Sequence, residues 1–236
     1  MPLVWRPRLI SNPRVLITSA AALMLSNGVV VLNQNLDVLV LGALSTTTEI
    51  AYYKVAFQLA ILMTIGLTVV NFLASRQLSH LYHKKDIAAL ESVSRNSTLL
   101  AIIFAAPFML MYVFFGEWIL TTFFGEKFVA SYPILLILVA AQFINAVFGI
   151  VGVLLNMTHF ERSTLWGVFW GAVVNVILSV ILVPTYGGVG AALAVVISTV
   201  TWNLLLYRMT LVKLGIQLLP YFPRLIKQAS KVVEKP

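Results

Sequence analysis

Six apolar runs divide the chain, and each is close to the length of a membrane-spanning helix. A hydrocarbon core of about 30 Å needs about 20 residues of helix, because a helix rises about 1.5 Å per residue. The runs are too long for strands and lack strict alternation. They predict an all-α integral membrane bundle of six transmembrane helices, at residues 16–43, 52–75, 97–119, 132–156, 163–183 and 189–209.

The composition agrees with a membrane protein. Of the 236 residues, 60% are hydrophobic and 10% are charged, whereas soluble domains carry about 25% charged residues. We therefore exclude a soluble enzyme, a nucleic-acid binder and a disordered chain. Cysteine is absent, so the chain has neither disulfides nor a thiolate metal site.

The basic residues predict the orientation of the chain. All but Lys54 and Lys127 of the 16 Lys and Arg residues fall on one side of the six predicted spans. Basic residues collect in cytoplasmic loops, so we expect both termini in the cytoplasm. Residues 1–213 form one lobe, and 214–236 form a basic amphipathic tail that either lies on the membrane surface or is solvated.

Polar side chains share one side of the first predicted span. On a helical wheel, Asn27, Asn33, Gln34 and Asp37 fall within one arc. Intramembrane polar groups normally face the bundle interior or a wet cavity. Asp37 is either a proton, ion or sugar-hydroxyl contact on a transport path, or a structural hydrogen-bond partner of a neighbouring helix.

The second predicted span carries a polar stripe along its whole length. Lys54 and Arg76 mark its two ends, and Gln58 lies within it. The two cations either attract a phosphate group at the mouths of a path or extend to the lipid headgroups.

The fourth and fifth predicted spans also carry aligned small and polar residues. On the fourth, Gln142 and Asn145 share an arc with three further positions: Gly149, Gly152 and Asn156. On the fifth, Gly167, Gly171, Asn175 and Ser179 recur every four residues. Such faces favour close helix packing, although Gln142 and Asn145 are also candidates for the path.

Motifs for covalent chemistry are missing. No phosphate-binding Gly-Lys-Ser/Thr loop is present. His80 and His83 are expected in a solvated loop, and His159 with Glu161 in a short one. We expect no enzyme activity, no cofactor and no metal.

Three segments now carry a resemblance: NQNLDVLVLGAL (33–44), YYKVAFQLA (52–60) and the glycine-rich VPTYGGVGAA (183–192). Together they resemble the polysaccharide and lipid-linked oligosaccharide flippases of the multidrug and oligosaccharide exporter superfamily. In the last segment, Pro184 is expected to end a helix, and Gly187 and Gly188 to allow a tight turn.

The resemblance implies one C-terminal six-helix half of a two-lobe transporter. Such proteins move an undecaprenyl-diphosphate-linked oligosaccharide, a precursor of O-antigen or exopolysaccharide, by alternating access without ATP. Asp37 and Lys54 fall in segments that match the family. We expect a second lobe as partner, supplied by a homodimer, a separate half or an N-terminal part, because an open half-cavity facing lipid is costly.

Two other functions stay open. A cation-coupled multidrug-type exporter would depend on Asp37 and leave surface glycan intact when deleted. A non-transporting scaffold of glycan assembly would tolerate changes at Asp37 and Lys54.

Overall fold

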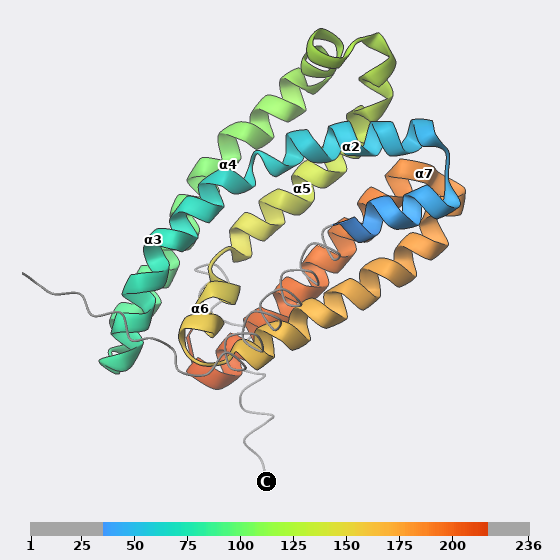
Figure 1. Ribbon diagram of the computed structural model, residues 1–236. Coiled ribbons are helices and arrows are strands. Elements are labelled where there is room, and N and C mark those ends of the chain that lie inside the picture. The colour runs from blue at the N-terminus through green and yellow to red at the C-terminus, as the bar shows by residue number, and fades with distance from the viewer. Residues whose placement is uncertain (1–34, 217–236) are drawn as a thin grey trace, which may run out of the picture. The chain divides into compact units, whose positions relative to one another are not determined.

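The computed structural model describes residues 35–216, and throughout that range the chain is helical with no strand. The described residues from Asp37 onward belong to one compact unit, and the description below concerns it. The elements are a helix at Asn35–Leu44, α2 (Thr47–Ile61), α3 (Thr64–His83), α4 (Ile87–Phe124), the 3₁₀ helix η1 (Glu126–Ser131), α5 (Tyr132–Phe148), α6 (Val151–Met157) and α7 (Glu161–Leu214), seen in Figure 1.

The longest element, α7, folds back on itself as a hairpin (Figure 1). Its two arms pack closely because glycines leave room for the opposite arm. A Cβ on Gly167 would lie 2.6 Å from Leu206 Cδ2, and one on Gly171 would lie 2.8 Å from Trp202 Cβ. Small residues on such a face let two helix backbones approach, which confirms the predicted packing face.

The reversal occurs at Gly187, as the sequence predicts. Its φ of 53° and ψ of −131° belong to a region that only glycine populates readily. The Glu49 carboxylate at the start of α2 accepts a hydrogen bond of 2.7 Å from the Gly188 backbone N–H. Pro184 lies inside the first arm rather than ending it, because the geometry that reverses the chain is supplied by Gly187.

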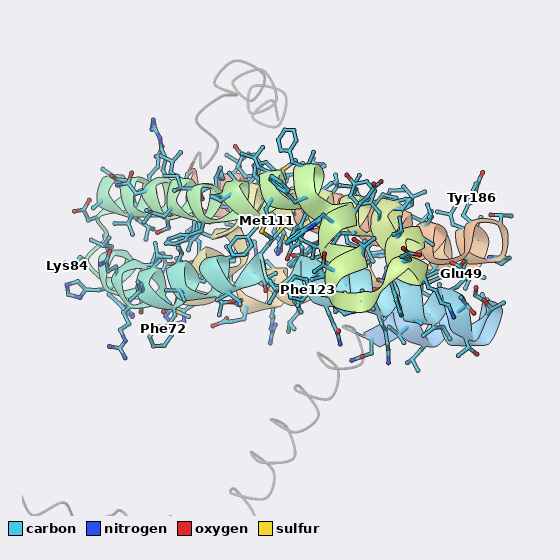
Figure 2. The ribbon with its side chains drawn as sticks, turned by 90° about the horizontal axis from the view of Figure 1, so that it is seen from above. Glu49, Phe72, Lys84, Met111, Phe123 and Tyr186 are labelled. Atoms are coloured by element: carbon cyan, nitrogen blue, oxygen red, sulfur yellow. The ribbon has the colours of Figure 1, made fainter. Side chains whose placement is uncertain are left out.

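The turns gather at two opposite ends of the bundle. We call them the Gly187 end, with the start of α2 and the α4–η1 junction, and the Lys84 end, with the α3–α4 turn and the turn before α7. Figure 2 shows Glu49 and Tyr186 at one end and Lys84 at the other. Tyr52 and Phe128 touch at the Gly187 end, with ring centroids 5.8 Å apart.

Two of the predicted spans are interrupted. The second is divided at Leu62–Met63 between α2 and α3, which are bent by 42°. The fourth is divided at Gly149–Ile150 between α5 and α6. The single continuous helix expected over 132–156 is therefore wrong, because a wheel assumes unbroken rotation, which this backbone lacks.

The helices also run further than the apolar runs. Residues 76–83 and 87–96, expected as a loop, continue α3 and α4. Asp86 begins α4 as its N-cap, with its side chain accepting a hydrogen bond from the Ala89 N–H at 3.0 Å. A cap of this kind stabilises the first turn of a helix, so helical structure extends beyond the apolar segment.

Two hydrophobic clusters fill the bundle. The first lies toward the Gly187 end and joins the helix Asn35–Leu44, α2, α5, part of α4 and the α7 turn, with Tyr53, Tyr112 and Leu135 at its centre. The second lies toward the Lys84 end and joins α3, the start of α4, α6 and the far half of α7, with Leu78 and Leu154 at its centre.

The described helices can cross a membrane, but they do not confirm six spans. By length and composition α4, Glu126–Phe148 and α7 qualify, and the bent pair α2–α3 makes a fourth. This count of membrane-spanning helices treats α7 as one helix, although its two arms form a hairpin. Most of the first predicted span lies outside the described residues, as does the predicted tail from residue 217 onward.

The contact between Glu49 and Gly188 predicts a measurable loss of stability. Replacing Glu49 with Ala removes the acceptor of a partly buried N–H, which costs about 1–3 kcal/mol. Glu49→Gln keeps an acceptor and is expected to lose less. Thermal unfolding of the purified protein in detergent measures both, with the exposed Glu117→Gln as the control. Equal stability of E49A and wild type would contradict the role of Glu49.

Candidate functional site

Asp37 lies inside the bundle, in contact with two other elements. Its side chain is 6% exposed, and its Oδ1 accepts a hydrogen bond of 2.5 Å from Asn175 Nδ2 on the first arm of α7. The buried Tyr53 hydroxyl on α2 interacts with the same carboxylate. Asp37 thus makes the interhelical hydrogen bond that the sequence analysis held as an alternative to a pathway role.

Within the described residues, no positive charge takes part in these interactions of Asp37. Its neighbours are an amide and a phenol, and the Asn175 Oδ1 atom is buried without a hydrogen-bond partner in the described structure. The carboxylate is therefore offset by neutral donors alone. Such a buried polar cluster is costly when any member loses its partner.

The polar stripe of the second predicted span lies on the surface of α2 and α3. Lys54, Gln58, Thr68 and Arg76 are all exposed. Around them, exposed apolar side chains such as Phe72 share the surface. A helix whose surroundings were lipid alone would not present amide and hydroxyl groups between two cations, so this face is the best candidate for a wet surface.

The two cations of this face have no ion-pair partner within residues 35–216. The Arg76 guanidinium lies over the Phe72 ring, 5.6 Å from its centroid. A cation–π contact holds a guanidinium in place while leaving its N–H groups available. Both cations remain free to meet an anionic group.

The two α5 candidates lie in the half-buried interior. Asn145 Oδ1 accepts a hydrogen bond of 3.4 Å from Asn203 Nδ2 on the second arm of α7. Gln142 is half-buried on the same helix. The break after α5 removes Gly152 and Asn156 from the continuous face expected for them. Asn33 and Gln34 lie outside the described residues.

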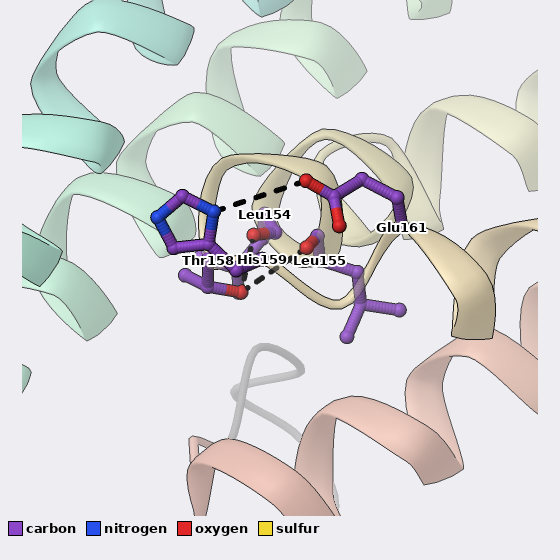
Figure 3. Close-up of polar contacts among 5 residues, drawn as sticks. All are labelled: Leu154, Leu155, Thr158, His159 and Glu161. Atoms are coloured by element: carbon purple, nitrogen blue, oxygen red, sulfur yellow. Dashed lines mark hydrogen bonds and ion pairs between the residues drawn. The ribbon is translucent and has the colours of Figure 1, made fainter.

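At the Lys84 end, two turns meet through aromatic rings. The rings of His83 and His159 are 5.8 Å apart, and His159 Nδ1 lies 3.9 Å from Glu161 Oε1. Figure 3 shows this ion pair beside Thr158, whose hydroxyl donates to the Leu154 carbonyl at 2.8 Å. Within the described residues no group of three metal-ligating side chains forms, so these contacts join two turns.

Sequence reasoning missed three residues that make polar contacts between the elements. Asn175 was assigned to packing, although an amide on a span facing another span with a carboxylate signals a possible pair. Tyr53 was read only as part of a motif. Glu49 gave no signal, because its bond to Gly188 joins residues far apart in the sequence.

Comparisons with known proteins add a family. Residues 1–133 match a family model described as polysaccharide biosynthesis protein. The chain is 26% identical over 163 residues to a Haloferax volcanii protein named "Probable low-salt glycan biosynthesis flippase Agl15". That segment covers 69% of this chain and 34% of the relative, so the chain matches about a third of the relative's length. No solved structure matches.

The Asp37–Asn175 pair predicts an asymmetry between single and double variants. Asn175→Leu leaves a buried carboxylate without the hydrogen bond from Asn175 Nδ2, and an unsatisfied buried acceptor costs about 1–3 kcal/mol, more when it is charged. The double variant D37L/N175L removes both polar groups and is expected to be more stable than N175L alone. Thermal unfolding in detergent measures both, and a double variant less stable than N175L would contradict the pairing.

Proposed function

Because the chain belongs to the polysaccharide biosynthesis protein family, we propose that it is one lobe of a flippase. The lobe moves a lipid-linked oligosaccharide across the bacterial cytoplasmic membrane by alternating access. The observation that carries this proposal is the exposed polar face of α2 and α3, which ends in Lys54 and Arg76.

The chemistry of this face suits a phosphate-bearing lipid-linked sugar. Amide and hydroxyl groups such as those of Gln58 and Thr68 hydrogen-bond to sugar hydroxyls. Ammonium and guanidinium groups bind phosphate strongly. A cation near each end of the face offers a phosphate contact on either side of the membrane. Transport along this face does not require ATP, because translocation down a concentration gradient needs only binding on one side of the membrane and release on the other.

A counterpart completes the path. The polar face is costly in lipid, so a second lobe covers it, either from another copy, a separate half or an N-terminal part of a longer protein. Six crossings result when the first predicted span, the α2–α3 pair, α4, α5 with α6 and each of the two α7 arms are counted once. An even number of crossings agrees with the cytoplasmic termini that the basic residues predict.

A translocation assay in cells tests the function. In a strain without the gene, plasmid-borne Lys54→Glu and Arg76→Glu are expected to lower surface glycan severalfold at unchanged protein abundance, because a carboxylate repels phosphate. Lys127→Glu, an exposed lysine outside the α2–α3 face, is the matched control. Normal surface glycan in the deletion strain, with no redundant exporter, would contradict the proposal. Resistance to cationic drugs that depends on Asp37 would favour the exporter instead.

Labelling from water tests the wet face directly. The chain has no cysteine, so a single introduced thiol is the only target. A membrane-impermeant maleimide is expected to label Thr68→Cys in intact membranes and to leave Ile177→Cys, an exposed apolar site on α7, unlabelled. Equal labelling of the two sites would contradict a polar path along α3.

A further inference from the structure

Helical hydrogen bonding is weakened in three neighbouring segments of the bundle. The three weak points lie at one level, that is, at the same height along the long axis of the bundle. The α2–α3 break has short-range hydrogen bonds, with Met63 N–H donating to the Ala60 carbonyl at 3.2 Å. This 3₁₀-type pattern replaces the α-helical one. The α5–α6 break falls at Gly149, and α4 carries Pro107 in its interior, where the Ile103 carbonyl loses its helical N–H partner.

Contacts between the helices place these three points together. The Tyr112 hydroxyl on α4 donates to the Leu59 carbonyl on α2 at 2.7 Å. Further along, a Cβ on Gly66 would lie 2.7 Å from Phe104 Cβ. Because α4 runs antiparallel to α2 and α3, Pro107 lies opposite Met63, between these two contacts.

The third weak point, the α5–α6 break at Gly149, lies at the same level because it contacts α3. A Cβ on Gly149 would lie 3.2 Å from Leu67 Cδ1, one turn beyond Met63. The two hydrophobic clusters also divide here. Met63, Leu67 and Ala146 belong to the first cluster, and Ile150 and Val151 belong to the second.

The α7 hairpin differs, because its arms pass this level unbroken. Its only non-helical residue is Gly187, at the far end. Its arms are fixed against each other at Gly167 and Gly171. Beside the α2–α3 break, by contrast, an apolar groove of about 450 Å³ between α2 and α4, lined in part by Leu62 and Phe115, leaves room for movement.

We propose that the lobe bends at this level. The segment formed by α3 and the first half of α4 swings about Met63, Pro107 and Gly149 against the straight α7 hairpin, and α6 follows it. This inference rests on the proposed function in one respect: the swing opens and closes the mouth of the path at the Lys84 end. The lobe is then not a rigid body within the transport cycle.

Paired spin labels measure the bend in the full-length protein. Leu99→Cys with Phe115→Cys places exposed labels on either side of Pro107 along α4. Leu165→Cys with Ile181→Cys places exposed labels at the same sixteen-residue separation on the unbroken arm of α7. Both pairs would be about 24 Å apart at their Cα atoms on a straight helix. In lipid nanodiscs, the α4 pair is expected to give a broad or two-peaked distance distribution, and the α7 pair a narrow one.

A proline substitution then tests whether Pro107 causes the bend in α4. Pro107→Ala restores the helical hydrogen bond and is expected to narrow the α4 distribution to that of α7. Pro184→Ala, at a proline in the interior of the first α7 arm, is the control and is expected to leave the α4 distribution broad. An α4 distribution as narrow as that of α7 in the wild type would overturn the proposal, as would a broad distribution that P107A leaves unchanged.

A surface-glycan assay on the same variants separates the two proposals. Narrowing by P107A together with a severalfold loss of surface glycan supports bending as a transport step. Broad wild-type distances that P107A narrows support bending even if the deletion strain keeps its glycan, a result that would contradict the flippase function alone.

Discussion

Close packing between the two arms of α7 is the contact from which the rest of the bundle is built. Gly167 and Gly171 let the arms approach until Leu206 and Trp202 fill the space between them. Three other segments attach to this hairpin through polar side chains, while α3 and α4 pack on each other and on α5. The helix Asn35–Leu44 joins it through Asp37, α2 through Glu49, and α5 through Asn145. In a membrane these polar attachments matter because burial of apolar surface distinguishes poorly between a neighbouring helix and lipid.

The sequence predicted the helical class, the α7 reversal and its packing face, because each follows from local rules. Long apolar runs require helices in a bilayer, and paired glycines allow a tight turn. The interruptions at Met63 and Gly149 escaped prediction. Neither Leu62 nor Met63 is a helix breaker, and Gly149 sits among residues that otherwise favour a helix. Tertiary contacts decided the backbone at both places.

The candidate site also has features that the sequence could predict and features that it could not. Lys54, Gln58 and Arg76 are exposed, but the break between α2 and α3 interrupts the helical wheel that aligned them in one stripe. The partner of Asp37 could not be read in this way, since periodicity orders residues around one helix but carries no information about which helix lies opposite. Asn175 was therefore grouped with its own glycine neighbours rather than with the carboxylate it binds.

The length of α4 has a consequence for the side of the protein that water reaches. Its 38 residues extend to roughly 57 Å, nearly twice the hydrocarbon thickness. The excess carries Glu91, Arg95 and Asn96, which belong outside lipid, and α3 accompanies it to Lys84. Over these residues α3 and α4 form an antiparallel helical spur where linkers were expected. A helical spur holds its side chains in a regular order along two helices, an order that a flexible linker lacks.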